Sequence, residues 1–379
     1  MRVLHFAKYA FVRTGGMERH VETLTRALAA RGVDVTVLAY DPSGQAAPQR
    51  IDGVRVEPVP TWLRVSSQAL APALAARARR LARAARFDVV HQHWPDPFAH
   101  VAASWVPGGP AQVVTWHMDI VRQRVLGSLY RTLAPWILTA PDAVIGATAA
   151  HLRSAQIDRF APPDRRHVIP FGIDADAFAA NPQRLGDAAR LRARHGGGPI
   201  VFALGRHVYY KGFDVLIRAM ERVPAVLLLG GEGPLTPRLR ELASRVGDRV
   251  RLVGSIPEAE LPTYFHACDL FCLPSVARTE AFGLVQAEAM VCGKPLVNTA
   301  LGTGVNELAP AGTCALTVPP GDADALADAL GRLLADPAKA AALGAAGRAR
   351  ILEGFTIEAM AQRTIELYES VLTRRARPT

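Results

Sequence analysis

Two glutamates, Glu280 and Glu288, stand eight residues apart in the segment EAFGLVQAE. Carboxylates accept hydrogen bonds from vicinal hydroxyls, so a ribose or another sugar ring is a natural partner for such a pair. If Glu280 precedes a helix and Glu288 lies on its second turn, both can face one ligand. The backbone N–H groups of Phe282, Gly283 and Leu284 would then point at an anion from the helix N-terminus. The alternative is that both acids only stabilise the start of a helix through their charge.

A second candidate group is cationic. Arg206 and Lys211 flank the loop GRHVYYKG, which follows an expected strand and enters a helix. Together they can clamp a diphosphate, Arg206 through its planar fork and Lys211 as a point charge. A solvated surface pair is the alternative. Only four of the 44 basic residues are lysines, which makes a chance lysine at this position less expected.

Two loops of the first half also carry candidate groups. Gly15 and Gly16 precede an expected helix and would let backbone N–H groups approach an anion, although they do not match the dinucleotide motif G-x-G-x-x-G. His117 ends an expected strand, where an imidazole can donate a proton or a hydrogen bond to a sugar or phosphate. The alternatives are a simple tight turn for the glycines and a structural role for the histidine.

Metal binding is not expected from these patterns. His91 and His93 have a spacing that suits an ion, but no third histidine or carboxylate nearby in the sequence completes a site. The D-x-D segments at 174–176 and 322–324 are better explained as caps. The four cysteines lie in apolar stretches without paired ligands, which indicates buried thiols in a reducing compartment.

The elements that position these residues alternate along the chain. Short apolar runs typical of buried strands occur at 3–6, 35–39, 89–90, 113–116, 144–147, 200–204, 226–229, 250–253, 270–273 and 296–298. Helical patterns occur at 18–30, 69–86, 97–105, 125–139, 149–156, 215–223, 237–246, 258–267 and 279–291. This alternation predicts two doubly wound α/β domains, 1–175 and 176–356, with a ligand cleft between them. A C-terminal helix in 357–379 is expected to pack back on the first domain.

The charge of the chain is uneven. The net charge is +10 over 379 residues, and residues 1–170 hold 21 basic and 12 acidic residues, a net of +9. No nucleic-acid recognition motif accompanies this excess, so it favours an anionic acceptor or lipid surface. The N-terminus has no signal peptide pattern and no apolar run reaches 18 residues, so we expect a cytoplasmic protein, peripheral on the inner face of the membrane.

The segment 69–87 bears on that surface. On a helical wheel Leu70, Leu74, Ala78, Leu81 and Ala85 share one side, and the opposite side carries Arg79, Arg80, Arg83 and Arg86. A basic amphipathic helix can lie on an anionic membrane, with Trp62, Leu63 and Val65 as further anchors. The alternative, slightly favoured for the apolar stripe, is a helix that packs its leucines on the sheet and leaves its arginines in water.

Taken together, these motifs resemble those of the retaining, GT-B-fold glycosyltransferases of family 4. The resemblance covers essentially the whole chain and rests on Gly15-Gly16, His117, the segment FGID at 171–174, the Arg206–Gly212 loop and the Glu280/Glu288 pair. It implies a metal-independent enzyme that uses a nucleotide sugar as its donor. The retaining reaction of this family is described as front-face attack, in which the leaving diphosphate helps to deprotonate the acceptor.

The resemblance also implies roles for individual residues. Arg206 and Lys211 would hold the donor diphosphate, with Gly15 and Gly16 against it from the other domain. Glu288 would hold the ribose hydroxyls. Glu280 and the N–H groups of Phe282, Gly283 and Leu284 would hold the transferred sugar and its phosphate, and His117 would contact the sugar near the reacting centre.

A narrower resemblance concerns the substrates. The segments WHMDIVRQ, which includes Arg122, VYYKG and GLVQ look like those of enzymes that build bacterial O-antigen and exopolysaccharide, often from GDP-mannose or GDP-rhamnose. Met118 replaces an expected small residue and Thr303 separates two glycines, so the donor sugar stays open. The implied acceptor is a polyprenyl-diphosphate-linked or other anionic glycan. The alternatives are a sugar-nucleotide epimerase of the same fold and a non-catalytic carbohydrate-binding protein.

Overall fold

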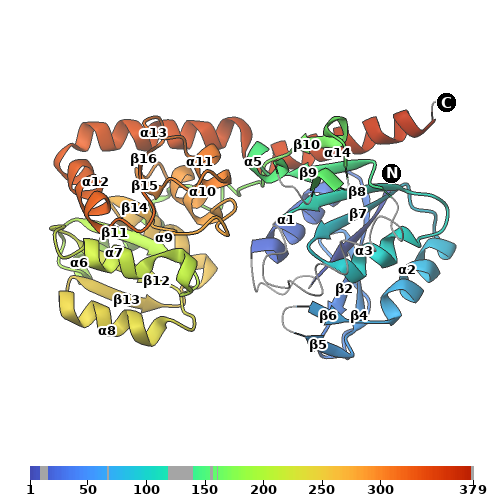
Figure 1. Ribbon diagram of the computed structural model, residues 1–379, viewed down its shortest axis with the longest axis horizontal. Helices are drawn as coiled ribbons and strands as arrows, with labels where there is room; N and C mark the ends of the chain where they lie inside the picture. The colour runs from blue at the N-terminus through green and yellow to red at the C-terminus, as the bar shows by residue number, and fades with distance from the viewer. Residues whose placement is uncertain (9–15, 66–67, 118–139, 154–156, 160, 377–379) are drawn as a thin grey trace. The chain divides into compact units, whose positions relative to one another are not determined.

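The computed structural model of the protein describes residues 1–8, 16–65, 68–117, 140–153, 157–159 and 161–376, which form two compact units (Figure 1). Unit 1 comprises Met1–Gly172 together with Ile357–Thr379, and unit 2 comprises Ile173–Thr356. The expected boundary between residues 175 and 176 lies three residues from the point where unit 1 gives way to unit 2. Unit 2 begins and ends at one place, because Ile173 N–H donates to Phe355 O at 2.8 Å.

Unit 1 is built on an eight-stranded sheet in the order β10-β9-β8-β7-β1-β2-β4-β3, in which only β3 and β4 pair antiparallel. Its strands are β1 (Arg2–Ala7), β2 (Asp34–Asp41), β3 (Gln49–Ile51), β4 (Val54–Pro60), β7 (Val89–Trp94), β8 (Ala111–Trp116), β9 (Ala143–Gly146) and β10 (Arg166–Val168). A separate hairpin contains β5 (Leu63–Val65) and β6 (Gln68–Leu70). The helices are α1 (Gly16–Ala30), α2 (Ala73–Ala84), α3 (Pro97–Ser104), α5 (Ala149–Leu152) and α14 (Ile357–Ala376).

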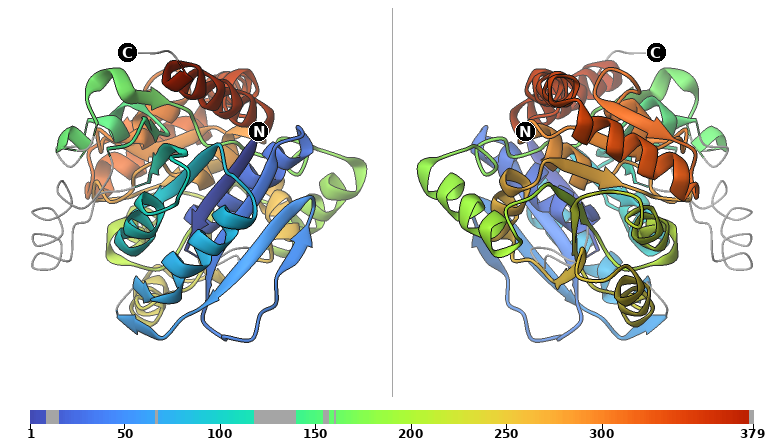
Figure 2. Two further views of the ribbon diagram at one scale, coloured as in Figure 1. Left: turned by 90° about the vertical axis from the view of Figure 1, so that its right-hand side faces the viewer. Right: turned by 90° about the vertical axis from the view of Figure 1, so that its left-hand side faces the viewer.

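Helices cover both faces of this sheet. Alternate strand residues such as Val3 and Val35 face a core that includes Leu24 of α1 and Tyr368 of α14. The residues between them, such as Leu4, face a second core with side chains from α2 and α3. The C-terminal helix α14, coloured dark red, thus completes the first unit of the chain (Figure 1). The left view of Figure 2 shows α2 and α3 on the near face of the sheet.

Unit 2 is built on a six-stranded, fully parallel sheet in the order β13-β12-β11-β14-β15-β16. Its strands are β11 (Ile200–Leu204), β12 (Val226–Gly230), β13 (Val250–Gly254), β14 (Leu270–Leu273), β15 (Leu296–Thr299) and β16 (Ala315–Val318). Its helices are α6 (Pro182–Arg194), α7 (Phe213–Ala219), α8 (Thr236–Val246), α9 (Leu261–Ala267), α10 (Leu284–Val291), α11 (Gly304–Leu308), α12 (Ala323–Ala335) and α13 (Pro337–Gly354).

The core of unit 2 also has two layers. Val201 and Ala203 of β11 face the apolar side chains of α7, α8 and α12. Phe202 points to the opposite face, where its ring lies 5.3 Å from that of Phe265 in α9. Figure 2, right, shows the helices on either side of this sheet. The predicted class, α/β with two doubly wound parallel sheets, is therefore confirmed.

Several boundaries differ from the sequence-based expectations. The helix expected from residue 69 begins at Ala73, because residues 68–70 pair in the β5–β6 hairpin and Leu70 is therefore not on its stripe. The helix expected from 279 begins at Leu284, because Gly283 takes the left-handed conformation with φ 74°. Helix α6 was not predicted at all, and the expected helix at 125–139 lies outside the described residues.

Helix α6 lies in a segment whose polar composition gives no clear helical pattern. Asn181 caps it by accepting a hydrogen bond from Arg184 N–H at 2.8 Å, and Pro182 occupies its first turn. Only Ala188 and Leu191 of this helix are buried, so its apolar periodicity is weak.

Candidate functional site

The chain order of unit 2 reverses between β11 and β14. From β11 the chain runs outwards through β12 and β13, and then returns to place β14, β15 and β16 on the other side. The loops after β11 and β14 leave the carboxyl edge of the sheet at this switch point, which is where open α/β sheets bind ligands. Lys211 follows β11 and Glu280 follows β14, so both candidate residues lie at this switch point.

Lys211 and Glu280 form an ion pair there. Lys211 Nζ lies 2.6 Å from Glu280 Oε2, and both side chains are about nine-tenths buried. Ser275 Oγ donates a second hydrogen bond to the same carboxylate oxygen at 3.0 Å. Thr303 Oγ1 donates to the backbone carbonyl of Glu280 at 2.8 Å. The carboxylate of Glu280 is thus held by the ammonium of Lys211 and by the hydroxyl of Ser275.

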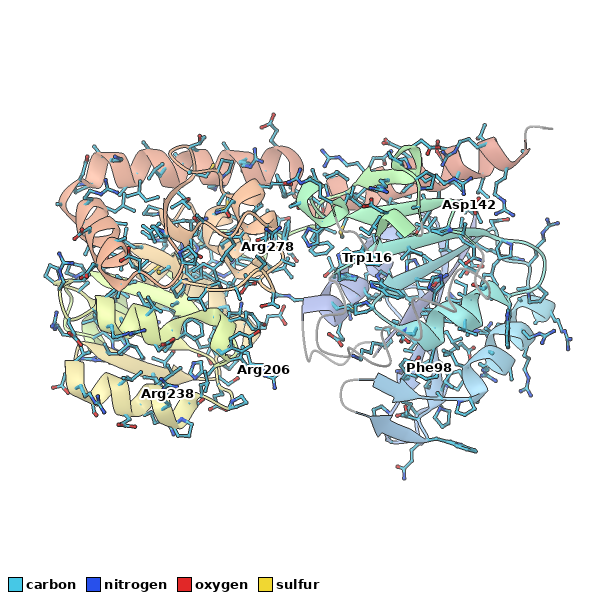
Figure 3. All side chains as sticks on the ribbon, in the orientation of Figure 1. Phe98, Trp116, Asp142, Arg206, Arg238 and Arg278 are labelled. Carbon is cyan, nitrogen blue, oxygen red and sulfur yellow. The ribbon has the colours of Figure 1, made fainter. Side chains whose placement is uncertain are left out.

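Close backbone packing fixes the loop that carries Lys211. Gly212 has φ 65°, and a Cβ at this position would meet Pro274 O at 2.1 Å. A Cβ on Gly231, in the loop after β12, would likewise meet Gly205 O at 2.0 Å. Glycine is therefore required at both positions, since no other residue allows the neighbouring loops to approach so closely. Arg206 is exposed, and its side chain points away from the ribbon of unit 2 (Figure 3).

The start of α10 carries the remaining candidate residues of unit 2. Gly283 is its N-cap residue, Leu284 begins the helix, and Phe282 is buried just before it. Gln286 fixes this start, because its Nε2 donates to Phe282 O at 3.3 Å and to Val305 O at 2.9 Å. Glu288 is buried on the second turn of the helix. The structure thus places Glu280 in the preceding loop and Glu288 in the helix.

The chain order of unit 1 also reverses, between β1 and β7, and a group of histidines lies there. His5 of β1 pairs in register with His91 of β7, and His93 lies two residues further on the same face. His20 comes from α1, and His117 follows β8. We call these five buried side chains the imidazole cluster: His5, His20, His91, His93 and His117.

Hydrogen bonds connect most of the imidazole cluster. His117 Nε2 lies 3.2 Å from His93 Nδ1, and His93 Nε2 lies 3.2 Å from His5 Nδ1. His91 is hydrogen-bonded to Thr115 at 2.7 Å and to Tyr368 of α14 at 2.5 Å. Burial lowers the pKa of His5 and His20 to about 3 and keeps the pKa of His91, His93 and His117 well below 6.5. All five imidazoles are therefore neutral at neutral pH.

The structure corrects one step of the sequence reasoning in this region. His91 and His93 lacked a third histidine by sequence spacing, but the fold brings His5, His20 and His117 to them. Nitrogens of His5, His91 and His93, and of His20, His93 and His117, lie within 4.8 Å of one another. Asp322 caps α12 as expected, because it accepts a hydrogen bond from Ala325 N–H. Asp174 accepts one from Ala177 N–H in a turn that no helix follows.

Other candidates have simpler placements. Gly16 begins α1, whereas Gly15, Met118 and Arg122 lie outside the described residues. On α2 the stripe of Leu74, Ala78 and Leu81 is buried in the core of unit 1, and Arg79, Arg80 and Arg83 are exposed. Cys268, Cys272 and Cys314 are buried thiols, while Cys292 is partly exposed. None of the described helices is long and apolar enough to cross a membrane.

Two family models match the chain: one described as Glycosyltransferase Family 4 over residues 14–177, and one described as Glycosyl transferases group 1 over residues 198–336. O-antigen chain mannosyltransferase C of Escherichia coli is 28% identical over 98% of this chain and 99% of its own. D-rhamnosyltransferase WbpZ of Pseudomonas aeruginosa is 31% identical over 94% and 92%. The structure of HepE from Anabaena in complex with UDP has a TM-score of 0.79 and 22% identity, covering 98% and 100%.

The two sheets and these matches define the class of protein, a GT-B-fold glycosyltransferase. The chain belongs to glycosyltransferase family 4, a family of retaining enzymes that transfer a sugar from a nucleotide sugar and generally act without a metal ion. Because members of this family are sugar-transfer enzymes, the sugar-nucleotide epimerase and the non-catalytic carbohydrate-binding protein are not retained as alternatives.

Proposed function

We propose that this glycosyltransferase moves a hexose, with GDP-mannose as its donor, to a lipid-linked or polysaccharide acceptor in cell-surface glycan synthesis. The observation that carries the proposal is the buried Lys211–Glu280 ion pair at the switch point of unit 2. It puts a cation for phosphate and an acceptor for sugar hydroxyls side by side. The name of the Escherichia coli relative supports a mannose-type sugar on an O-antigen chain, and the name of the Pseudomonas aeruginosa relative supports a rhamnose-type sugar.

In this proposal, unit 2 holds the donor. Arg206 and Lys211 bind the diphosphate, which gives Lys211 a second anionic partner beside Glu280. Glu280, oriented by Ser275 and Lys211, accepts hydrogen bonds from the transferred sugar. Glu288 accepts those of the ribose hydroxyls. The N–H groups of Phe282, Gly283 and Leu284 face the phosphate, where the helix N-terminus favours negative charge.

The chemistry that these groups assist is a front-face displacement. The bond between the sugar's anomeric carbon and the β-phosphate oxygen breaks, and the acceptor oxygen bonds to the same face of that carbon. The acceptor's proton passes to the departing phosphate oxygen. Arg206, Lys211 and the N-terminus of α10 stabilise the negative charge that grows on this leaving group. His117 of unit 1, a neutral imidazole, contacts the sugar by hydrogen bonding, and Gly16 at the start of α1 approaches the diphosphate.

A donor screen tests this site. GDP-mannose, GDP-rhamnose, UDP-glucose and UDP-N-acetylglucosamine are each offered, and release of the nucleoside diphosphate is measured. We expect turnover with GDP-mannose that falls about a hundredfold or more in Lys211→Ala and in Glu280→Ala. Lys339→Ala and Glu353→Ala, on the exposed face of α13, are matched controls that keep turnover. Normal turnover in both site variants would refute the assignment, and turnover only with another donor would refute GDP-mannose.

The acceptor proposal concerns unit 1. Its excess positive charge and the exposed Arg79, Arg80 and Arg83 of α2 suit a polyprenyl-diphosphate-linked glycan at an anionic membrane. Because the leucine stripe of α2 is buried in the core, the attraction comes from charge and from Trp62, whose side chain is 84% exposed.

Liposome sedimentation tests the membrane contact. We expect the triple variant Arg79→Glu, Arg80→Glu, Arg83→Glu to lose binding to vesicles that contain anionic lipid, because each reversal replaces attraction with repulsion. The matched control reverses Arg238, Arg240 and Arg245, three exposed arginines of α8 in unit 2, and keeps the binding. Equal sedimentation of the wild type and the α2 variant would contradict the proposal.

A further inference from the structure

The imidazole cluster holds more nitrogen ligands than the transfer reaction uses. Its described members include two groups of three buried histidines, His5/His91/His93 and His20/His93/His117, whose nitrogens lie within 4.8 Å of one another. Neutral imidazole is the ligand that Zn²⁺ and similar first-row cations prefer among uncharged side chains. Each group of three is therefore a candidate metal site, and they differ in how free their nitrogens are.

The first group is poorly suited to an ion. Both nitrogens of His91 are engaged, one by Tyr368 and the other by Thr115. His5 and His91 are also completely buried in the sheet, with no exposed surface. An ion at this position would have to break two short hydrogen bonds deep inside unit 1.

The second group is better suited. His20 Nε2 is buried and has no hydrogen-bond partner in the described part of the chain. His20 and His117 keep 7% and 5% of their surface exposed, so the group reaches the edge of unit 1. The separation of His93 Nδ1 and His117 Nε2 is 3.2 Å. Two nitrogens that bind one tetrahedral ion at about 2.0–2.1 Å lie about 3.3 Å apart, so this pair already has the required spacing.

We propose that His20, His93 and His117 form a binding site for Zn²⁺ or a similar borderline cation, with the fourth coordination position open. His5 supports it, because His93 can donate its Nε2–H to His5 Nδ1 and so direct the Nδ1 lone pair at the ion. In the free protein one proton lies in the hydrogen bond between His93 Nδ1 and His117 Nε2. When the ion binds, this proton moves to the other nitrogen of the imidazole that carried it. Three imidazoles with one open position match known zinc sites.

The ion would oppose the transfer reaction. This part of the inference rests on the proposed function, in which the imidazole of His117 contacts the transferred sugar. A cation bound to His117 Nε2 takes a lone pair of this imidazole and puts a positive ion beside the position of the sugar. The site is therefore inhibitory, and the enzyme is active when it is empty.

Metal binding is measured first, without reference to activity. The full chain is treated with chelator, freed of it and titrated with Zn²⁺ against a chromophoric indicator. Co²⁺ is used in parallel for its visible absorption. We expect one Zn²⁺ per chain, bound at least tenfold more weakly by His20→Gln. His20→Cys, which replaces one ligand with another, retains the ion and adds a thiolate-to-cobalt absorption band. His100→Gln, at a buried histidine of α3 outside the cluster, binds like the wild type.

The outcomes separate the two proposals. Failure to bind Zn²⁺, or equal binding by His20→Gln and the wild type, would overturn the metal site whatever the enzyme's activity. Inhibition of diphosphate release by Zn²⁺ in the wild type, and not in His20→Gln, supports the inhibitory role. Binding that depends on His20 but leaves turnover unchanged overturns inhibition alone. Absence of turnover with every donor overturns the proposed function and leaves the binding result standing.

Discussion

Lowering the pH from about 7.5 to about 5.5 should destabilise unit 1 strongly, because it folds around histidines that stay neutral. His5 and His20 have a pKa of about 3 in the folded chain, and His100 has one of about 4, all lowered by burial. In the unfolded chain each returns to about 6.5. Between these values the unfolded state binds more protons than the folded state, so stability is lost as the pH falls below 6.5.

The size of the loss follows from these pKa values. At about pH 5.5 an imidazole that ionises only on unfolding lowers the free energy of unfolding by RT ln(1 + 10), about 1.4 kcal/mol. Three such histidines together lower the free energy of unfolding by about 4 kcal/mol. Asp96 opposes them, since burial raises its pKa to about 6 and its protonation returns about 0.8 kcal/mol. His91, His93 and His117 act in the same direction as the first three, so about 3 kcal/mol is a lower bound.

The assay is urea unfolding in the presence of chelator, followed by tryptophan fluorescence. All five tryptophans lie in the sequence of unit 1, so the transition reports on that unit alone. The unfolding midpoint should fall at the lower pH. His100→Gln should recover about 1.4 kcal/mol of the loss. His195→Gln, at a partly buried histidine of unit 2, is the matched control and should recover nothing in this signal.

An unchanged midpoint between the two pH values would refute the reasoning, because it would mean that the histidines ionise equally in the folded and unfolded states. A loss that is the same in His100→Gln and the wild type would show that another group is responsible.

Three further predictions concern single positions. Gly212→Ala should lower the free energy of unfolding of unit 2 by about 3 kcal/mol or more, because the new Cβ would meet Pro274 O at 2.1 Å and the φ is 65°. The melting temperature followed by circular dichroism should fall, and an unchanged value would contradict this. Asp96→Asn should stabilise unit 1 at about pH 7.5 by up to about 3 kcal/mol, since the pKa rises from 3.8 to about 6, and the gain should vanish near pH 4; an equal gain at both pH values would count against it. Glu57→Gln should destabilise unit 1 by about 3 kcal/mol in urea, because the fully buried carboxylate pairs with two arginines; a loss below about 0.5 kcal/mol would show that the pair is not stabilising.

Much of the fold could be predicted because parallel strands are buried on both faces. Runs such as 200–204 and 270–273 are continuously apolar, and they stand out from the helices between them. Helix α6 escaped prediction because it buries only Ala188 and Leu191, so its capping residues were the only strong signal. The start of α10 was misplaced for a different reason, since the positive φ of Gly283, 74°, cannot be read from the local sequence pattern.

The residue types of the site could be predicted from the sequence, but the contact between Lys211 and Glu280 could not. Lys211 and Glu280 lie 69 residues apart, and they meet because β11 and β14 are neighbours at the switch point. Ser275, which holds the carboxylate of Glu280, carries no signal beyond following a strand. His5 and His20 could not be predicted as members of the cluster. In the sequence, a histidine inside a strand or helix cannot be told from another partly polar core residue until its neighbours in space are known.

The return of α14 to unit 1 has a consequence for synthesis of the protein. Tyr368 is fully buried there and is bonded to His91, so the first unit lacks part of its core until Ile357–Ala376 has been translated. Unit 2 is translated in full before that helix, and its two ends meet at Ile173 and Phe355. The half of the chain that leaves the ribosome first is therefore the one that matures last.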